Sequence, residues 1–155
     1  MLLNKHRILY TEDHEDTKEL VRFILARFNY EVVSTSNAVD ALRLAHEQKF
    51  DLYLLDTRLA DGSGVDLCKR IREFDNHTPI LFYSAAAFDG DKKTALECGA
   101  QAYLTKPATP NELSRAISSL FALAQTATVP NGDGASKIHV DGDGGLSSCL
   151  DPGRP

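Results

Sequence analysis

The sequence has no long apolar run and no excess of basic residues. None of its 155 residues lie in a segment approaching the roughly 20 consecutive apolar residues that a membrane-spanning helix needs. The formal net charge is −5, whereas a nucleic-acid-binding surface needs a basic patch or stripe. We therefore expect no membrane span and no nucleic-acid interface.

Cysteine is also scarce. Cys68, Cys98 and Cys149 show no CxxC spacing and no accompanying histidine cluster. An odd number of cysteines without metal-ligand spacing is typical of free thiols in a reducing compartment. The N-terminus leads straight into a strand-like segment, without a charged leader and a long apolar region. These features predict a cytoplasmic protein without a signal peptide.

Apolar periodicity is missing from the end of the chain. Residues 125–155 hold six of the ten glycines and three of the six prolines. Such a segment has too little apolar surface to offset the entropy lost on ordering. The sequence therefore predicts one domain over residues 1–124 and a disordered, low-complexity tail over residues 125–155.

Before that point, five short apolar segments of strand length alternate with five helical segments. The strands are expected at residues 7–11, 30–34, 51–56, 79–83 and 101–105, and the helices at 15–28, 36–48, 65–74, 91–98 and 109–124. Strands that alternate with helices at short spacing form parallel crossovers. We predict an α/β fold, a flavodoxin-like doubly wound five-stranded parallel sheet of order 2-1-3-4-5 with five helices.

Polar residues follow four of these strands. They are Glu12 and Asp13, Asp56, Ser84, and Lys106. The carboxyl ends of parallel strands meet at one edge of a sheet, so these side chains should lie close together. Three neighbouring carboxylates repel one another. A hard divalent cation such as Mg²⁺ relieves that repulsion, because it prefers carboxylate and carbonyl oxygens.

This set of groups suits phosphoryl transfer to Asp56. A cation and Lys106 would stabilise charge on the phosphoryl oxygens. Carboxylates are known to form aspartyl phosphate. Gly62 and Gly64 follow Asp56 closely, so the backbone there can approach the site.

The order of these residues resembles the receiver domain of bacterial two-component response regulators, over roughly residues 5–124. The matching features are an acidic pair after the first strand, an aspartate after the third, a glycine eight residues later, a hydroxyl after the fourth strand and a Lys-Pro pair after the fifth. They are Glu12-Asp13, Asp56, Gly64, Ser84 and Lys106-Pro107. Each feature alone is weak, but all five in order are specific.

The resemblance implies a role for each acidic residue. Asp56 corresponds to the phosphoacceptor. Glu12, Asp13 and Asp56 correspond to the ligands of an Mg²⁺ cofactor, with the backbone carbonyl of Arg58 as a further ligand.

The resemblance also implies a switch. Ser84 and Lys106 correspond to the residues that bind the phosphoryl group, and Tyr103 to an aromatic switch residue. Gly64 belongs to the loop beside the site, and Pro107 permits a cis peptide after Lys106.

A sensor histidine kinase or a histidine phosphotransfer protein is then the expected phosphoryl donor. The face formed by the fourth helix, the fifth strand (101–105) and the fifth helix is expected to bind a downstream effector or a second copy of the chain. Such a domain turns over no separate metabolite, so we do not expect an enzyme.

Three alternatives stay open on the residues alone. A phosphatase with an aspartyl nucleophile usually carries a second aspartate two residues later, where this chain has Arg58. A flavin-binding domain needs a phosphate-cradling loop after the first strand, where residues 11–16 are acidic. A receiver used only for docking, independently of phosphorylation, would not need the acidic pair or Lys106.

Overall fold

The computed structural model describes residues 4–126, 137–140 and 146–149. Helices and strands alternate along the first of these ranges. The main elements are β1 (Arg7–Thr11), α1 (Glu15–Arg27), β2 (Glu31–Thr35), α2 (Ala38–Glu47), β3 (Leu52–Leu55), α3 (Gly64–Arg72), β6 (Ile80–Ser84), α4 (Asp89–Glu97), β7 (Ala102–Thr105) and α5 (Pro110–Thr126).

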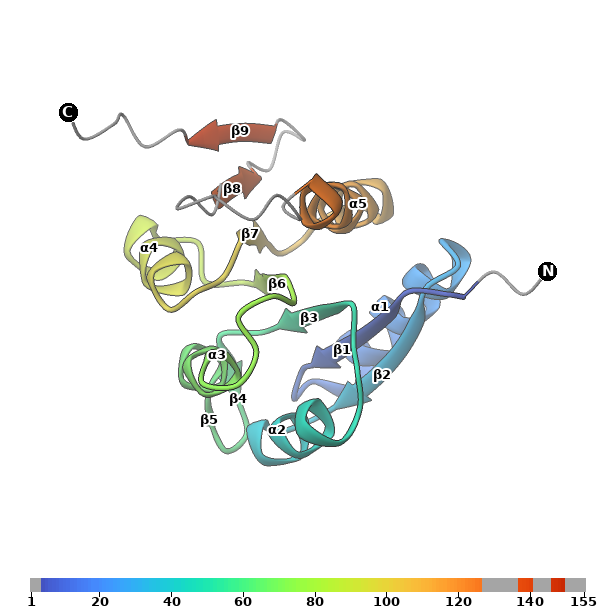
Figure 1. Cartoon of the computed structure of the whole chain (residues 1–155), viewed down its shortest axis with the longest axis vertical. Coiled ribbons are helices and arrows are strands. Elements are labelled where there is room, and N and C mark those ends of the chain that lie inside the picture. Colours follow the sequence, from blue (N-terminus) through green and yellow to red (C-terminus); the bar gives the residue numbers. More distant parts are fainter. Residues whose placement is uncertain (1–3, 127–136, 141–145, 150–155) are drawn as a thin grey trace.

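These five strands form a parallel sheet in the order β2-β1-β3-β6-β7. Counted along the chain, that order is the predicted 2-1-3-4-5. Figure 1 shows α1 and α5 on one face of the sheet and α2, α3 and α4 on the other. The predicted flavodoxin-like α/β fold is therefore confirmed.

The central strands β3 and β6 are apolar up to Ser84 because both faces of the sheet are covered. All four residues of β3 and all five residues of β6 are buried. Successive side chains of a strand point to opposite faces. Leu52 and Leu54 accordingly pack in the core beneath α1 and α5, whereas Tyr53 and Leu55 pack in the core beneath α2, α3 and α4.

The helix ends follow local capping chemistry. Asn29, just beyond α1, has a φ of 66°, a left-handed conformation that asparagine tolerates better than most residues. At the start of α5, Thr109 and Glu112 each accept a hydrogen bond from the other's backbone N–H, at 3.2 and 3.0 Å. These reciprocal bonds form a capping box, which satisfies two backbone N–H groups at the helix start.

The loop after β3, which holds Gly62, has regular structure of its own. It contains a two-stranded antiparallel ribbon of β4 (Arg58–Leu59) and β5 (Gly62–Ser63). Directly after it, Gly64 begins α3. A Cβ atom on Gly64 would lie 1.8 Å from the backbone oxygen of Asp56. Only glycine allows α3 to begin so close to the end of β3.

Two further strands lie in the region where the sequence predicts a tail. β8 (Lys137–Val140) pairs in parallel with β7, and β9 (Leu146–Cys149) pairs antiparallel with β8. No strand was expected there, although β-branched residues recur at Ile138 and Val140 and β7 would otherwise be an edge strand. Residues 127–136, 141–145 and 150–155 of the predicted disordered tail lie outside the described residues. Their disorder and the domain boundary near residue 124 stay predictions.

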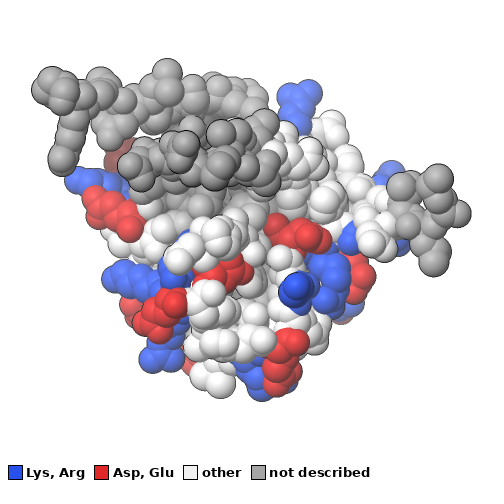
Figure 2. Space-filling model, in the orientation of Figure 1, with Lys and Arg blue, Asp and Glu red and all other residues white. Residues whose placement is uncertain are grey.

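The surface carries charges of both signs. Figure 2 shows acidic and basic side chains interspersed over the visible face, and the described residues on that face form no continuous basic patch. Within the described part of the chain, no helix is long and apolar enough to cross a membrane.

We predict that Gly64→Ala lowers the free energy of unfolding by about 1–3 kcal/mol, the usual effect of overpacking. The reason is that the backbone atoms of Asp56 cannot move aside. Gly90→Ala in α4 is the matched control. A Cβ at Gly90 meets nothing within 4 Å, so its stability should stay the same or rise slightly. Urea unfolding of both variants measures the difference, and equal stabilities would refute the close approach.

Candidate functional site

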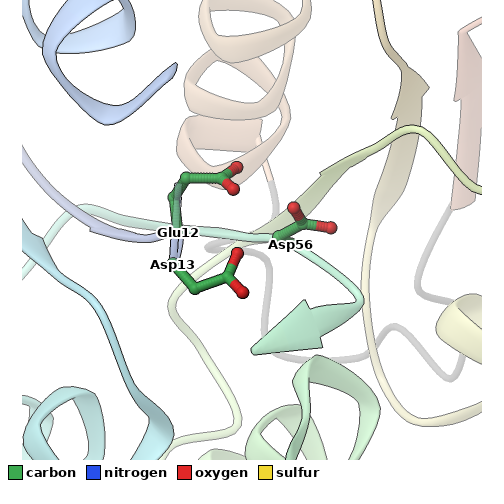
Figure 3. A group of neighbouring side chains, drawn as sticks. All are labelled: Glu12, Asp13 and Asp56. Carbon is green, nitrogen blue, oxygen red and sulfur yellow. The ribbon is translucent and has the colours of Figure 1, made fainter. Parts of the chain in front are cut away.

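The carboxylates of Glu12, Asp13 and Asp56 meet at the carboxyl ends of β1 and β3. Thr11 lies opposite Leu55 in the register of these parallel strands, so the acidic residues that follow are neighbours. One carboxylate oxygen from each of the three residues lies within 4.8 Å of the others, and Figure 3 shows the groups around a common space. Glu12 and Asp56 are only 2% and 8% exposed, whereas Asp13 is exposed.

Lys106 compensates part of this charge from the end of β7. Its ammonium nitrogen donates to Glu12 Oε2 and lies 3.0 Å from Asp56 Oδ2. The lysine side chain is 17% exposed and its Nζ also lies 5.3 Å from the centre of the Tyr83 ring. The Lys106-Pro107 peptide is cis, as the sequence permits.

These contacts shift the pKa values of the two buried carboxyl groups in opposite directions. Burial raises the pKa of Glu12, and the negative charge of Asp56 raises it further. The hydrogen bond and the positive charge of Lys106 lower this pKa only in part. Burial also opposes ionisation of Asp56. There, however, the charge and the hydrogen bond of Lys106 prevail, so the pKa of Asp56 lies below its ordinary value. Asp56 is consequently a carboxylate at neutral pH.

Ser84 and Tyr103 form a second group of contacts beside the carboxylates. The Ser84 hydroxyl lies 2.6 Å from the hydroxyl of Thr57 and accepts a hydrogen bond from the Ala86 backbone N–H at 3.2 Å. The Tyr103 side chain is fully buried, and its hydroxyl donates to the Ala86 carbonyl. Both predicted switch residues therefore contact the short loop after β6.

An open cleft of about 860 Å³ gives access to the site. Asp13, Asp56 and Thr57 line one part of it, and residues 84–88 with the first turns of α4 line another. Asp56 is thus mostly buried but still reachable by a small anion.

The donor set fits a divalent cation. Three carboxylates face a single ammonium group, so the cluster keeps excess negative charge. Carboxylate oxygens are the ligands that Mg²⁺ prefers in proteins.

Comparison with known families identifies the domain. The sequence model of the family described as "Response regulator receiver domain" matches residues 8–118. This chain belongs to the response regulator receiver domain family. The resemblance seen in the sequence is therefore confirmed.

Curated relatives of this receiver domain are response regulators. The chain is 34% identical over 125 residues to the alkaline phosphatase synthesis transcriptional regulatory protein PhoP of Bacillus subtilis, covering 81% of this chain and 52% of PhoP. It is 33% identical over 102 residues to the polar-differentiation response regulator DivK of Brucella anthropi, covering 64% of this chain and 83% of DivK. The chain thus spans about half the length of PhoP but most of DivK.

Solved structures of receiver domains share the fold. A LuxR-family two-component response regulator from Aurantimonas sp. SI85-9A1 is 30% identical with a TM-score of 0.73, covering 77% of this chain and 86% of that one. The receiver domain of sensor histidine kinase PA1611 from Pseudomonas aeruginosa PAO1 is 28% identical with a TM-score of 0.72, covering 77% of this chain and 99% of that one. The PA1611 structure is described as having a magnesium ion coordinated in its active site cleft.

The receiver fold brings most of the predicted site residues into contact. Lys106 touches Glu12 and Asp56, and a hydrogen bond with the Ser84 side chain helps to lower the pKa of Asp56. Ser84 also contacts Thr57 and the Ala86 backbone, and Tyr103 contacts the Ala86 carbonyl. The backbone N–H of Arg58 lies 3.4 Å from Asp56 Oδ1, and the ligand role of its carbonyl stays a prediction.

Sequence reasoning missed two residues of the site. The hydroxyl of Tyr10 donates to Glu12 Oε2 at 3.1 Å, and Thr57 holds the Ser84 hydroxyl. Tyr10 could have been found, because it lies two residues before Glu12 and side chains alternate along a strand. Thr57 gave no signal beyond its position after Asp56.

We predict that Lys106→Met, in buffer containing EDTA, lowers the free energy of unfolding at pH 7 by about 3 kcal/mol, as expected when one partner of a buried ion pair is removed. Urea unfolding from pH 7 to pH 4.5 measures the effect. The deficit should shrink as the pH falls.

The two carboxyl groups cause the loss of stability in the variant to shrink as the pH falls. In the native protein the lowered pKa of Asp56 gives stability above its ordinary pKa of 3.8, and this is lost as the pH falls. Without Lys106, both carboxyl groups bind protons more readily in the folded than in the unfolded protein. Lowering the pH therefore reduces the variant's loss in free energy of unfolding. Lys93→Met, which removes an exposed ion pair with Glu97, should change little at any pH. A deficit independent of pH would indicate lost packing alone.

Proposed function

We propose that this receiver domain accepts a phosphoryl group on Asp56 from the phosphohistidine of a sensor histidine kinase or a histidine phosphotransfer protein. The observation that supports this most is the ionised carboxylate of Asp56. It lies at the floor of an open cleft, beside two further carboxylates and Lys106.

The transfer requires a nucleophile and a means of stabilising the phosphoryl oxygens. An Asp56 oxygen forms the new bond to phosphorus as the bond between phosphorus and the imidazole nitrogen of the donor breaks. Lys106 Nζ, already 3.0 Å from Asp56 Oδ2, is placed to stabilise negative charge on the transferred group. Because Lys106 holds Oδ2, the other carboxylate oxygen is the better candidate nucleophile.

Mg²⁺ is the cofactor that this site suits. Glu12, Asp13 and Asp56 would hold it, with the backbone carbonyl of Arg58 as a further ligand. When bound, Mg²⁺ supplies positive charge that offsets the carboxylates and the incoming phosphoryl group.

The contacts around Ala86 offer a route from the site to the surface. A phosphoryl group on Asp56 would give the Ser84 hydroxyl a new acceptor in competition with Thr57. Because Ala86 bonds both Ser84 and Tyr103, a shift of this loop would favour another arrangement of α4, β7 and α5. A downstream effector or a second copy of the chain would bind the face formed by α4, β7 and α5.

We regard the protein as a cytoplasmic signalling module rather than an enzyme. Arg58 occupies the position where an aspartyl phosphatase usually carries its second aspartate. A docking-only receiver would have no use for the buried Glu12–Lys106–Asp56 contacts, which are costly to desolvate.

We predict that incubation with acetyl phosphate and Mg²⁺ adds the mass of one phosphoryl group to the intact protein. Asp56→Asn should abolish the gain, because the amide is not a nucleophile. Asp66→Asn, which changes an exposed acidic residue in α3, should leave it unchanged. Absence of any gain in the native protein would reject the proposal.

We further predict that Asp13→Asn weakens Mg²⁺ binding at least about tenfold, the lower end of the loss when even an outer-shell partner of a metal site is removed. Isothermal titration calorimetry measures the affinity. Asp16→Asn, at an exposed acidic residue outside the cluster, is the control and should bind Mg²⁺ as the native protein does. Equal affinities in both variants would exclude Asp13 as a ligand.

A further inference from the structure

Two free cysteines meet where α3 packs against the end of α4, away from the acidic cluster. Cys68 lies in α3 and is fully buried, whereas Cys98 directly follows α4 and is half-buried. The Cys68 thiol donates to the backbone carbonyl of Cys98, with a sulfur–oxygen distance of 3.5 Å. The Cys98 thiol donates to the Ala95 carbonyl at 2.9 Å. One sulfur is therefore already packed against the other cysteine.

Arg72 holds the two segments in this arrangement. Its Nε donates to the Gly99 carbonyl at 3.0 Å, and its Nη1 donates to the carbonyls of Asp75 and Thr78 at 2.9 and 2.8 Å. Gly99 has a φ of 113°, and a Cβ there would lie 2.9 Å from Arg72 Cγ. The chain beyond Cys98 thus passes close against α3.

The two thiols differ in acidity. The adjacent Cys68 thiol lowers the pKa of Cys98, and the positive charges of Lys69 and Arg72 act in the same direction. Cys98 and burial together raise the pKa of Cys68. A partly exposed thiol with a lowered pKa is the type that reacts with oxidants, and a neighbouring protonated thiol can resolve the product.

We propose that Cys68 and Cys98 are a peroxide-sensitive pair that closes to an intramolecular disulfide and ties α3 to the end of α4. The Cys98 thiolate attacks one oxygen of hydrogen peroxide, forming a sulfenic acid and releasing hydroxide. The Cys68 sulfur then attacks the Cys98 sulfur and releases water. The two thiols lose two electrons and two protons, and the peroxide is reduced to two molecules of water.

The disulfide would act on the mobility of α4. Phe88 precedes α4 without a side-chain capping bond, whereas Arg72 of α3 bonds the Gly99 carbonyl just beyond the other end of that helix. A covalent tie there restricts the positions that α4 can adopt. An effect on signalling rests on the proposed function, whereas disulfide formation and the restraint of α4 do not.

The test uses the full chain with Cys149→Ser, which leaves Cys68 and Cys98 as the only thiols. Hydrogen peroxide treatment should remove the mass of two hydrogens from the monomer and leave no thiol that N-ethylmaleimide can alkylate after denaturation. Dithiothreitol should restore both thiols. With Cys68→Ser added, dimedone should trap a sulfenic acid on Cys98; with Cys98→Ser added, it should trap none.

Hydrogen exchange then tests the restraint itself. Backbone amides of residues 89–97 should exchange severalfold more slowly in the oxidised protein, and peroxide should not slow them in the Cys68→Ser variant. The proposal is overturned if both thiols stay alkylatable, if the cross-link joins two chains, if the mass rises by oxygen without loss of hydrogen, or if α4 exchange is unchanged in the disulfide form.

Discussion

The ammonium group of Lys106 lies between two buried carboxylates, and the geometry of the site depends on that contact. Glu12, Asp56 and Lys106 come from the ends of three strands, so the contact exists only when β1, β3 and β7 keep their register. Without the lysine, two desolvated negative charges would face each other. With it, Asp56 stays ionised at the floor of an open cleft. The apolar strands and their two cores are what hold these charges in place.

The site is linked to the surface by short polar contacts. Thr57, the residue after Asp56, bonds the Ser84 hydroxyl, and Ala86 bonds both Ser84 and Tyr103. These contacts join the ends of β3 and β6 to Tyr103 in β7, just before α4 begins. Because Thr57 directly follows Asp56, a change of charge at Asp56 acts next to the hydrogen bonds that position this loop. Gly64 completes the arrangement, because its missing side chain lets α3 start against Asp56.

Much of the fold and of the candidate site was predictable, because strand periodicity and strand-end residues are local features of a sequence. Apolar runs before Glu12, Asp56 and Ser84 predicted the sheet, and the sheet implied that these residues converge. Which atoms would then touch was not predictable. That Lys106 bonds Glu12 as well as Asp56, and that Tyr10 bonds Glu12, depends on rotamers set by the packed core. The strands β4, β5, β8 and β9 were missed because they are short, and their pairing depends on where the rest of the fold places them.

We propose that Asp56, and not a neighbouring carboxylate, carries the phosphoryl group. Borohydride reduces an acyl phosphate to an alcohol, which converts a phosphorylated aspartate to homoserine at its own position. After phosphorylation with acetyl phosphate and Mg²⁺, reduction and fragmentation mass spectrometry locate the modified residue. We predict homoserine at position 56 alone. Reduction at Glu12 or Asp13, or no reduced residue in a phosphorylated protein, would contradict the account.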